Sequence, residues 1–135
     1  MRYMFDTNIC IYLMRQHPPE VAERFATMNY GDVMISAIAL AELRYGVERH
    51  PESRATAERA LNALLEEVPV LAFEGNAAVG YGVLRAAVRG RKRDALDRLI
   101  ASHAVSLSLT LVTNNEADFK DYPGLIVENW INANR

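Results

Sequence analysis

The sequence predicts an α/β fold with a mainly parallel central sheet. Short apolar runs of strand length alternate along the chain with longer segments whose apolar residues recur at helical spacing. Strands that are separated by helices favour right-handed crossovers, which place helices on both faces of the sheet. The 135 residues contain no Gly/Ser linker, low-complexity tract or internal repeat, so a single domain over residues 1–135 is expected.

The first half of the chain begins with a strand over residues 3–5, which ends at Asp6. A helix with one buried face follows, until His17 and two prolines interrupt it. A second helix is predicted at 20–28 and a second strand at 33–35. Ser36 is placed to cap a helix that stops near Gly46, and residues 52–67 form a strongly amphipathic helix.

The second half begins with an edge strand over residues 68–71, because Pro69 cannot donate a hydrogen bond to a neighbouring strand. A helix is predicted at 75–88, and a basic loop follows at 91–93. Asp94 can cap a helix that continues to about Leu107. Strands are expected at 110–113 and 126–127. Ligand sites in such sheets gather beyond the carboxyl ends of the strands, where Asp6 and residues 113–118 fall.

Composition restricts the classes of protein to which the chain can belong. A hydrophobic fraction of 50% is typical of a globular protein, and a net charge of −2 requires that any nucleic acid be bound locally. The only cysteine, Cys10, excludes an internal disulfide and a multi-cysteine zinc site, and is expected in the core. Because no secretory leader or membrane-spanning segment is recognisable, a cytoplasmic protein without a membrane partner is expected.

Four carboxylates lie in separate segments beside residues that should be buried: Asp6, Glu42, Asp97 and Asp118. Carboxylates that are brought together repel one another unless a hard cation keeps them ionised. Oxygen ligands favour Mg²⁺, with Mn²⁺ as the expected substitute. Such an ion leaves room for a phosphate oxygen and an attacking water, so phosphodiester hydrolysis is the expected chemistry.

Each acid also has a purely structural interpretation. Asp6 could cap the first helix, and Asp97 could act with Asp94 as a capping-box-like pair. Glu42 could form an ion pair with the arginine two residues later or with a distant one, and Asp118 could be a surface turn residue. These interpretations are the commoner ones for single acids, whereas four such acids together favour a metal site.

Four segments, in this order, resemble the VapC-type PIN-domain toxins, which are ribonucleases of type II toxin–antitoxin pairs. They are residues 4–8 (MFDTN), 36–46 (SAIALAELRYG), 97–104 (DRLIASHA) and 111–119 (LVTNNEADF). Residues 123–130 (PGLIVENW) are similar to the family's C-terminal pattern. The resemblance covers essentially the whole chain and implies a PIN-like three-layer α/β/α sandwich.

The resemblance also implies roles for individual residues. Asp6, Glu42 and Asp97 would be the principal metal-binding and catalytic acids, with Asp118 as a more variable fourth. The supporting polar residues would be Thr7, Thr113 and Asn115. The implied substrate is RNA, in particular transfer RNA and among these initiator tRNA. The implied partners are a VapB-like antitoxin and a second copy of the chain, within a larger toxin–antitoxin assembly.

Some features depart from this pattern or admit alternatives. Many relatives have a proline and a glycine before the acid equivalent to Asp97, whereas residues 91–96 here are RKRDAL, and Asp94 could add outer-sphere contacts. His103 lies six residues after Asp97 on one helix and is therefore expected to be packed rather than catalytic. The alternatives are a PIN-like nuclease that acts on DNA or in RNA maturation, and a response-regulator-like or other doubly wound module that binds Mg²⁺ without catalysis.

Overall fold

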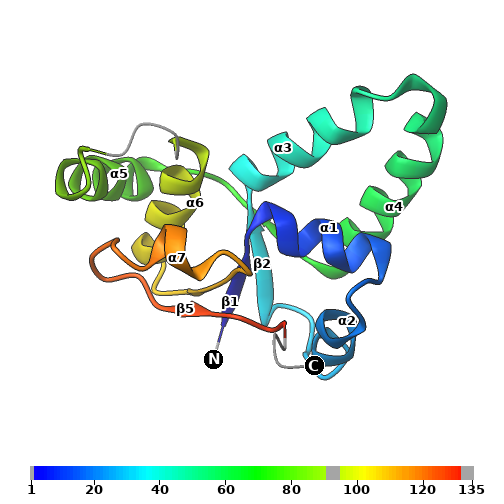
Figure 1. Cartoon of the computed structure of the whole chain (residues 1–135), viewed down its shortest axis with the longest axis horizontal. Helices are drawn as coiled ribbons and strands as arrows, with labels where there is room; N and C mark the ends of the chain where they lie inside the picture. Colours follow the sequence, from blue (N-terminus) through cyan, green and yellow to red (C-terminus); the bar gives the residue numbers. More distant parts are fainter. Residues whose placement is uncertain (1, 91–94, 132–135) are drawn as a thin grey trace.

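A five-stranded parallel sheet forms the centre of the computed structural model, which describes residues 2–90 and 95–131 (Figure 1). The strands are β1 (Tyr3–Phe5), β2 (Val33–Ser36), β3 (Val70–Leu71), β4 (Thr110–Val112) and β5 (Val127–Glu128). Their order in the sheet is β3-β2-β1-β4-β5, and every pair of neighbours is parallel. The carboxyl ends of all five strands therefore lie at the same edge of the sheet.

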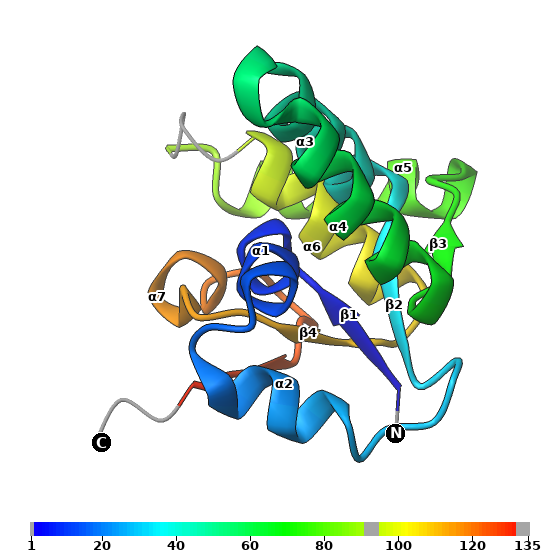
Figure 2. The same cartoon turned by 90° about the vertical axis from the view of Figure 1, so that its right-hand side faces the viewer.

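The helices that connect these strands cover both faces of the sheet. They are α1 (Thr7–Arg15), α2 (Pro19–Phe25), α3 (Ala37–Glu48), α4 (Arg54–Glu67), α5 (Gly75–Ala87), α6 (Ala95–Ser106) and α7 (Glu116–Phe119), with a short 3-10 helix (Pro51–Ser53) before α4. In Figure 1, α1, α2 and α4 lie on one side of β1 and β2, and α5 and α6 lie on the other. Figure 2 views the molecule from the α1–α2–α4 side. This arrangement is the expected three-layer α/β/α sandwich.

Alternate residues of β1 belong to two separate hydrophobic clusters. Tyr3 and Phe5 pack with residues of α1, α2 and α4, and the ring of Trp130 meets both of them edge-on. Met4 points to the opposite face and packs with residues of α5 and α6. The period of two is the pleat of the strand, which explains why a central parallel strand is apolar on both faces.

Several element boundaries differ from the sequence-based expectation. α3 continues through Gly46 to Glu48, and α2 ends earlier than expected, at Phe25, where the Thr27 hydroxyl donates to the carbonyl of Arg24. The segment from Pro51 begins as a 3-10 turn. The short helix α7 was not expected, because four residues are too few to show a helical period.

Cys10 is buried, as expected, and no helix of the described residues is both long enough and apolar enough to cross a membrane.

Candidate active site

Asp6 follows β1 directly and is held at the carboxyl edge of the sheet by its own backbone. Its N–H donates to the carbonyl of Val112 in β4 at 3.1 Å, which continues the pairing of β1 with β4. Its side chain caps α1, since Oδ1 accepts the N–H of Ile9 at 2.9 Å. The capping role expected for Asp6 is therefore present, and only 5% of the residue is exposed. Such a carboxylate has little freedom to move.

Thr113 occupies the equivalent position after β4, next to Asp6. It is fully buried, and its side chain hydrogen-bonds the Asp6 carboxylate. Its hydroxyl oxygen also accepts the N–H of Asn115 at 2.9 Å, so the hydroxyl proton is available to Asp6. The two adjacent strand ends thus orient one carboxylate between them.

Glu42 lies in the middle of α3 and is half-buried. Its Oε1 accepts the hydroxyl of Thr7, the first residue of α1, at 2.6 Å. The expected alternative, an ion pair with an arginine, is not found among the described residues, and Arg44 pairs with Glu48 and Glu58 instead. Asp6 and Thr7 are neighbours, so this hydrogen bond brings Glu42 to the same strand end.

Asp118 and Asn115 form a third acid–partner pair. Asn115 directly precedes α7, and its Nδ2 donates to Oδ2 of Asp118 at 2.5 Å. Asp118 is half-buried within α7. Each of the three predicted supporting residues therefore bonds a different predicted acid: Thr113 bonds Asp6, Thr7 bonds Glu42 and Asn115 bonds Asp118.

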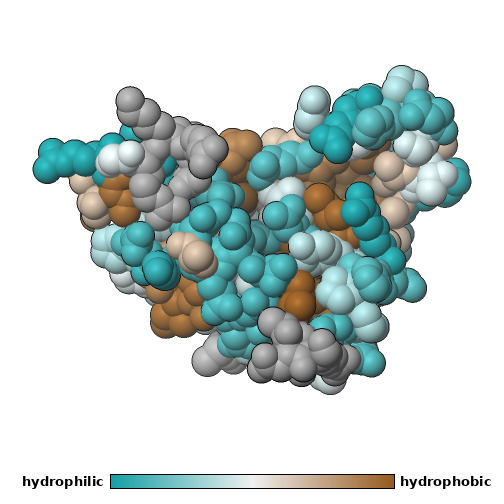
Figure 3. All heavy atoms as spheres, in the orientation of Figure 1, coloured by the Kyte–Doolittle hydropathy of each residue, from teal (hydrophilic) through white to brown (hydrophobic). Residues whose placement is uncertain are grey.

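Asp97 lies in the first turn of α6 and is half-buried. Leu96, the residue before it, lines the same hollow of about 980 Å³ as Thr7 and Glu42. The hollow lies among α1, α3 and α4, and Figure 3 shows hydrophobic side chains between α1 and the α3–α4 pair. Arg98, the next residue, is buried, which hydrophobic patterning did not reveal. Asp94 and the basic loop at 91–93 lie outside the described residues.

The PIN-domain family model matches residues 3–125. The chain is 38% identical to "Ribonuclease VapC2" of Rickettsia felis over 96% of this chain and 98% of the relative. It is 37% identical to "tRNA(fMet)-specific endonuclease VapC" of Shigella flexneri, with the same coverage. A crystal structure of DNA-bound VapBC from Salmonella typhimurium superposes with a TM-score of 0.88 and 34% identity, covering 97% of this chain and 99% of that one.

This chain belongs to the VapC ribonucleases of the PIN-domain family. The predicted family, fold class and enzyme class are thereby confirmed. A non-catalytic, response-regulator-like module, which was the alternative from another class of protein, finds no support in these likenesses.

The electrostatics of this VapC site centre on Asp6. Burial raises the pKa of the Asp6 carboxyl above its ordinary value, and the negative charge of Glu42 raises it further. The hydrogen bonds from Thr113, Ile9 and Asn8 act in the opposite direction without cancelling the effect of burial. Within residues 2–90 and 95–131, neither Asp6 nor Glu42 has an ion-pair partner. The strand end is therefore a place where negative charge is confined without a counter-ion from the described chain.

The structure brings Asp6 and Glu42 into electrostatic contact, whereas the convergence of all the acids stays a prediction. In the described part of the chain, no three His, Cys, Asp or Glu side chains are grouped closely enough to form a metal site as they stand. His103 was expected to be packed, and this is confirmed. It is buried, and its Nδ1 lies 2.8 Å from Oγ of Ser36.

Proposed function

We propose that this VapC-family chain is the toxin of a type II toxin–antitoxin pair and a cytoplasmic, Mg²⁺-dependent endoribonuclease. In this proposal, Asp6, Glu42 and Asp97 hold the metal, and Asp118 lies at the rim as a fourth acid. Mn²⁺ can replace Mg²⁺. The observation that carries the proposal is the buried Asp6 carboxylate, which faces the charge of Glu42 without a cationic side chain beside it among the described residues.

The residues at this edge of the sheet fit a hard divalent cation. Their donors are carboxylate and hydroxyl oxygens, which Mg²⁺ and Mn²⁺ prefer over nitrogen or sulfur. A cation would also remove the electrostatic cost that raises the pKa of Asp6, since it favours the ionised carboxylate. Thr113 and Thr7 donate hydrogen bonds to the acids and so leave other lone pairs of Asp6 and Glu42 for the ion.

The chain's own residues contribute orientation to the reaction. Asp6 is fixed by the Ile9 N–H and by Thr113, so its carboxylate is held before any substrate arrives. The Thr7 hydroxyl holds Glu42 against the start of α1. A bound divalent cation would supply an activated water and neutralise charge on the scissile phosphate, which requires no covalent enzyme intermediate.

The proposed substrate is transfer RNA, with initiator tRNA as the first candidate. Support comes from the Shigella flexneri relative, whose name specifies tRNA(fMet) and which matches over nearly the whole chain. The test is incubation of the purified protein with a complete tRNA pool in Mg²⁺, followed by sequencing of the new RNA ends. We expect cuts concentrated in one tRNA and none in EDTA. Cleavage that is equal in EDTA, or confined to DNA, would contradict the proposal.

The proposed partner is a small VapB-like antitoxin whose C-terminal segment lies across the acids. Support comes from the VapBC complexes among the similar structures and from the apolar hollow beside Glu42. An arginine of the antitoxin can satisfy the carboxylates with paired hydrogen bonds and thereby replace the cation. Mn²⁺ should then bind the toxin alone and be displaced by the antitoxin. Equal Mn²⁺ binding in the complex would contradict this mode of inhibition.

A homodimer is part of the same proposal. The two N-terminal helices were expected to supply an apolar surface through Tyr12 and Phe25, but both side chains also pack against the chain's own core. Beside them lies a hollow of about 720 Å³ with Tyr30 exposed at its border. Sedimentation of the isolated toxin over a range of concentrations tests the dimer, which a monomer at every concentration would rule out.

A further inference from the structure

His103 is a buried, titratable side chain that the proposed reaction does not use. It lies in the last part of α6 and is 1% exposed. Its Nδ1 is 2.8 Å from Oγ of Ser36, which is 67 positions earlier in the chain. A buried polar contact between distant segments costs free energy to desolvate, so it specifies how those segments fit together.

Ser36 is the residue at which β2 ends and α3 begins. It is fully buried, and its Oγ accepts the N–H of Ile38 at 3.0 Å, so it caps α3. The same oxygen meets His103. If Nδ1 is unprotonated, the Ser36 hydroxyl donates to it; in the other tautomer, Nδ1–H donates to Oγ. Either tautomer joins the start of α3 to the side of α6.

The ring of His103 is also held from another element. Phe73 packs against it edge-on, with ring centroids 5.4 Å apart and the ring planes at 75°. Burial lowers the pKa of His103, so the ring is neutral at pH 7. The backbone of Ala72 lies near enough to oppose that shift, although Nε2 makes no hydrogen bond of good geometry with the described residues. Among the described residues, the ring of His103 is therefore held by its hydrogen bond to Ser36.

Two of the proposed metal-binding acids lie at equal sequence distances from this contact. Glu42 is six residues after Ser36 on α3, and Asp97 is six residues before His103 on α6. Six helical residues span about 9 Å. In Figure 1, the axes of α3 and α6 run in different directions. A tilt of α6 by about 10° at His103 would therefore move Asp97 by about 1.5 Å relative to Glu42.

We propose that the Ser36–His103 hydrogen bond is the buried fixed point from which α3 and α6 present Glu42 and Asp97 to one metal ion. His103 is then a positioning residue, which acts through the helix that carries Asp97. This inference rests on the proposed function, because it concerns the spacing of the acids proposed there. It assigns a role to a histidine that touches neither metal nor RNA.

Matched substitutions separate the hydrogen bond from packing. His103→Phe keeps a planar ring against Phe73 and removes both nitrogens, whereas His103→Asn loses packing but keeps a polar atom near the position of Nδ1. Leu111→Val, in the hydrophobic cluster to which Ala101 and Ala104 of α6 belong, is a control for general loosening of the core. Mn²⁺ binding is measured by electron paramagnetic resonance without RNA, and melting temperature is measured without metal.

We expect the variant that melts nearest to wild type to bind Mn²⁺ most weakly, and the variant that melts lower to bind it almost normally. His103→Phe should melt near the wild-type temperature yet bind Mn²⁺ about ten-fold more weakly or worse, as outer-shell substitutions do. His103→Asn should melt lower but bind within about three-fold of wild type, as should Leu111→Val. Wild-type Mn²⁺ affinity in His103→Phe, or an affinity that simply follows melting temperature across the set, would overturn the inference.

A second pair of variants covers the case in which His103→Phe does not fold. Ser36→Ala removes the hydroxyl, whereas Ser36→Thr keeps it, and the same Mn²⁺ titration should show weakened binding only for Ser36→Ala. Equal binding by the two would overturn the inference.

Failure of the proposed function gives a different result. If wild type binds no Mn²⁺, or if Asp6→Asn binds it as well as wild type does, the metal site itself is wrong. If those two behave as expected and only the His103 and Ser36 variants do not, the positioning role alone is wrong.

Discussion

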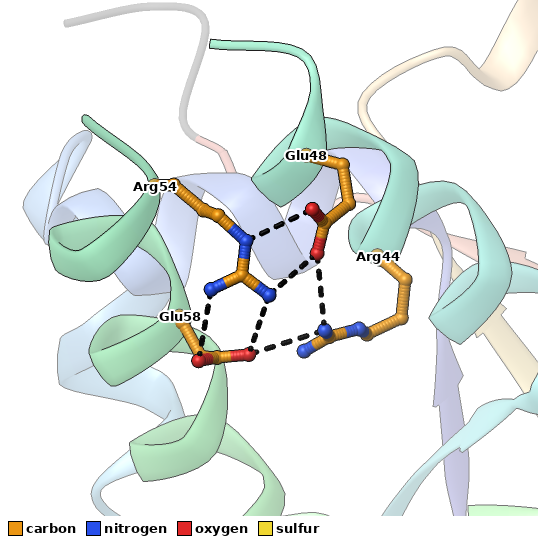
Figure 4. A network of polar contacts seen from close by, with 4 residues as sticks. All are labelled: Arg44, Glu48, Arg54 and Glu58. Atoms are coloured by element: carbon orange, nitrogen blue, oxygen red, sulfur yellow. Dashed lines mark hydrogen bonds and ion pairs between the residues drawn. The ribbon is translucent and has the colours of Figure 1, made fainter. Parts of the chain in front are cut away.

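Two clusters of charged residues in this molecule both include residues of α3, but one combines opposite charges and the other combines like charges. Where α3 meets α4, Arg44, Glu48, Arg54 and Glu58 form a network of alternating sign (Figure 4). At the carboxyl edge of the sheet, Asp6 and Glu42 have the same sign, and no described cationic side chain pairs with either. On α3, Glu42 lies two residues before Arg44 and six residues before Glu48.

The pKa shifts of the two clusters have opposite directions. Hydrogen bonds from Arg54 and Arg44 lower the pKa values of Glu48 and Glu58. Burial and the charge of Glu42 outweigh the hydrogen bonds to Asp6 and raise its pKa. Charges that neutralise one another need nothing else, whereas confined like charges need a cation from outside. The contrast separates a structural cluster from a candidate site more clearly than the number of acidic residues does.

Removal of one site carboxylate should have the largest effect. Asp6→Asn keeps the helix cap, because asparagine caps as well as aspartate, but removes the charge proposed to hold the metal. We expect RNA cleavage to fall by about three orders of magnitude or more, and likewise for Glu42→Gln and Asp97→Asn. Glu58→Gln in the opposite-sign network is the matched control and should cleave within about two-fold of wild type.

Circular dichroism must show that these variants are folded before their rates are compared. A folded Asp6→Asn protein that cleaves like wild type, with the same Mg²⁺ dependence, would remove the distinction between the two clusters.

The rim acid should matter less than the buried one. Asp118 is half-buried and bonded by Asn115, so Asp118→Asn can keep much of that contact through its remaining carbonyl oxygen. We expect a loss of about ten-fold in the cleavage rate, with a higher Mg²⁺ concentration needed for half-maximal activity. A loss as large as that of Asp6→Asn would place Asp118 among the principal acids.

Added metal should raise the melting temperature only when the pair of like-charged acids, Asp6 and Glu42, is intact. A ligand at 100 times its dissociation constant stabilises a protein by about 2.7 kcal/mol, so Mn²⁺ should raise the melting temperature of wild type and of Glu58→Gln. Asp6→Asn should melt higher than wild type without metal, because no charge is buried, and should gain little when Mn²⁺ is added. Equal metal-induced shifts in all three proteins would contradict a site at Asp6.

A third type of titratable group, buried and neutral, should respond to pH. Burial lowers the pKa of His103 below its ordinary value of 6.5, so the unfolded chain binds the proton first as pH falls. This contribution to stability is complete above pH 6.5 and is lost as pH falls from 6.5 toward the folded pKa. Denaturant unfolding of wild type and His103→Phe, with metal chelated, should diverge in that window. Parallel pH profiles would show that His103 titrates normally.

The smallest effect is expected where α3 meets α4. Arg54→Gln removes the residue that binds both glutamates, but the network is exposed and solvent screens it. We expect a small fall in melting temperature, which disappears as salt approaches about 1 M, with cleavage unchanged. A large loss of activity would show that the network controls the site through α3.

Local sequence patterns predicted much of the fold but only part of the candidate site. Asp6 and Thr113 could be placed at strand ends because apolar runs stop before them. That the two strands are adjacent depends on the pairing of β1 with β4, which no local pattern contains. Arg44, the nearest partner considered for Glu42, pairs instead with Glu48 and with Glu58, and the contact with Glu58 comes from another helix. Helix α7 was missed because four residues show no period.

The pairing of β1 with β4 also has a consequence for the order in which the chain is made. Tyr3 lies opposite Thr110, and Phe5 lies opposite Val112. β1 therefore cannot pair with β4 until residues more than a hundred positions later have been synthesised. Asp6 gains its backbone bond to Val112 and its contact with Thr113 only then. A ribosome that stalls earlier, or a protease that removes the last third, leaves a fragment in which these contacts cannot form. The strand end that holds Asp6 is therefore incomplete throughout most of the translation of the chain.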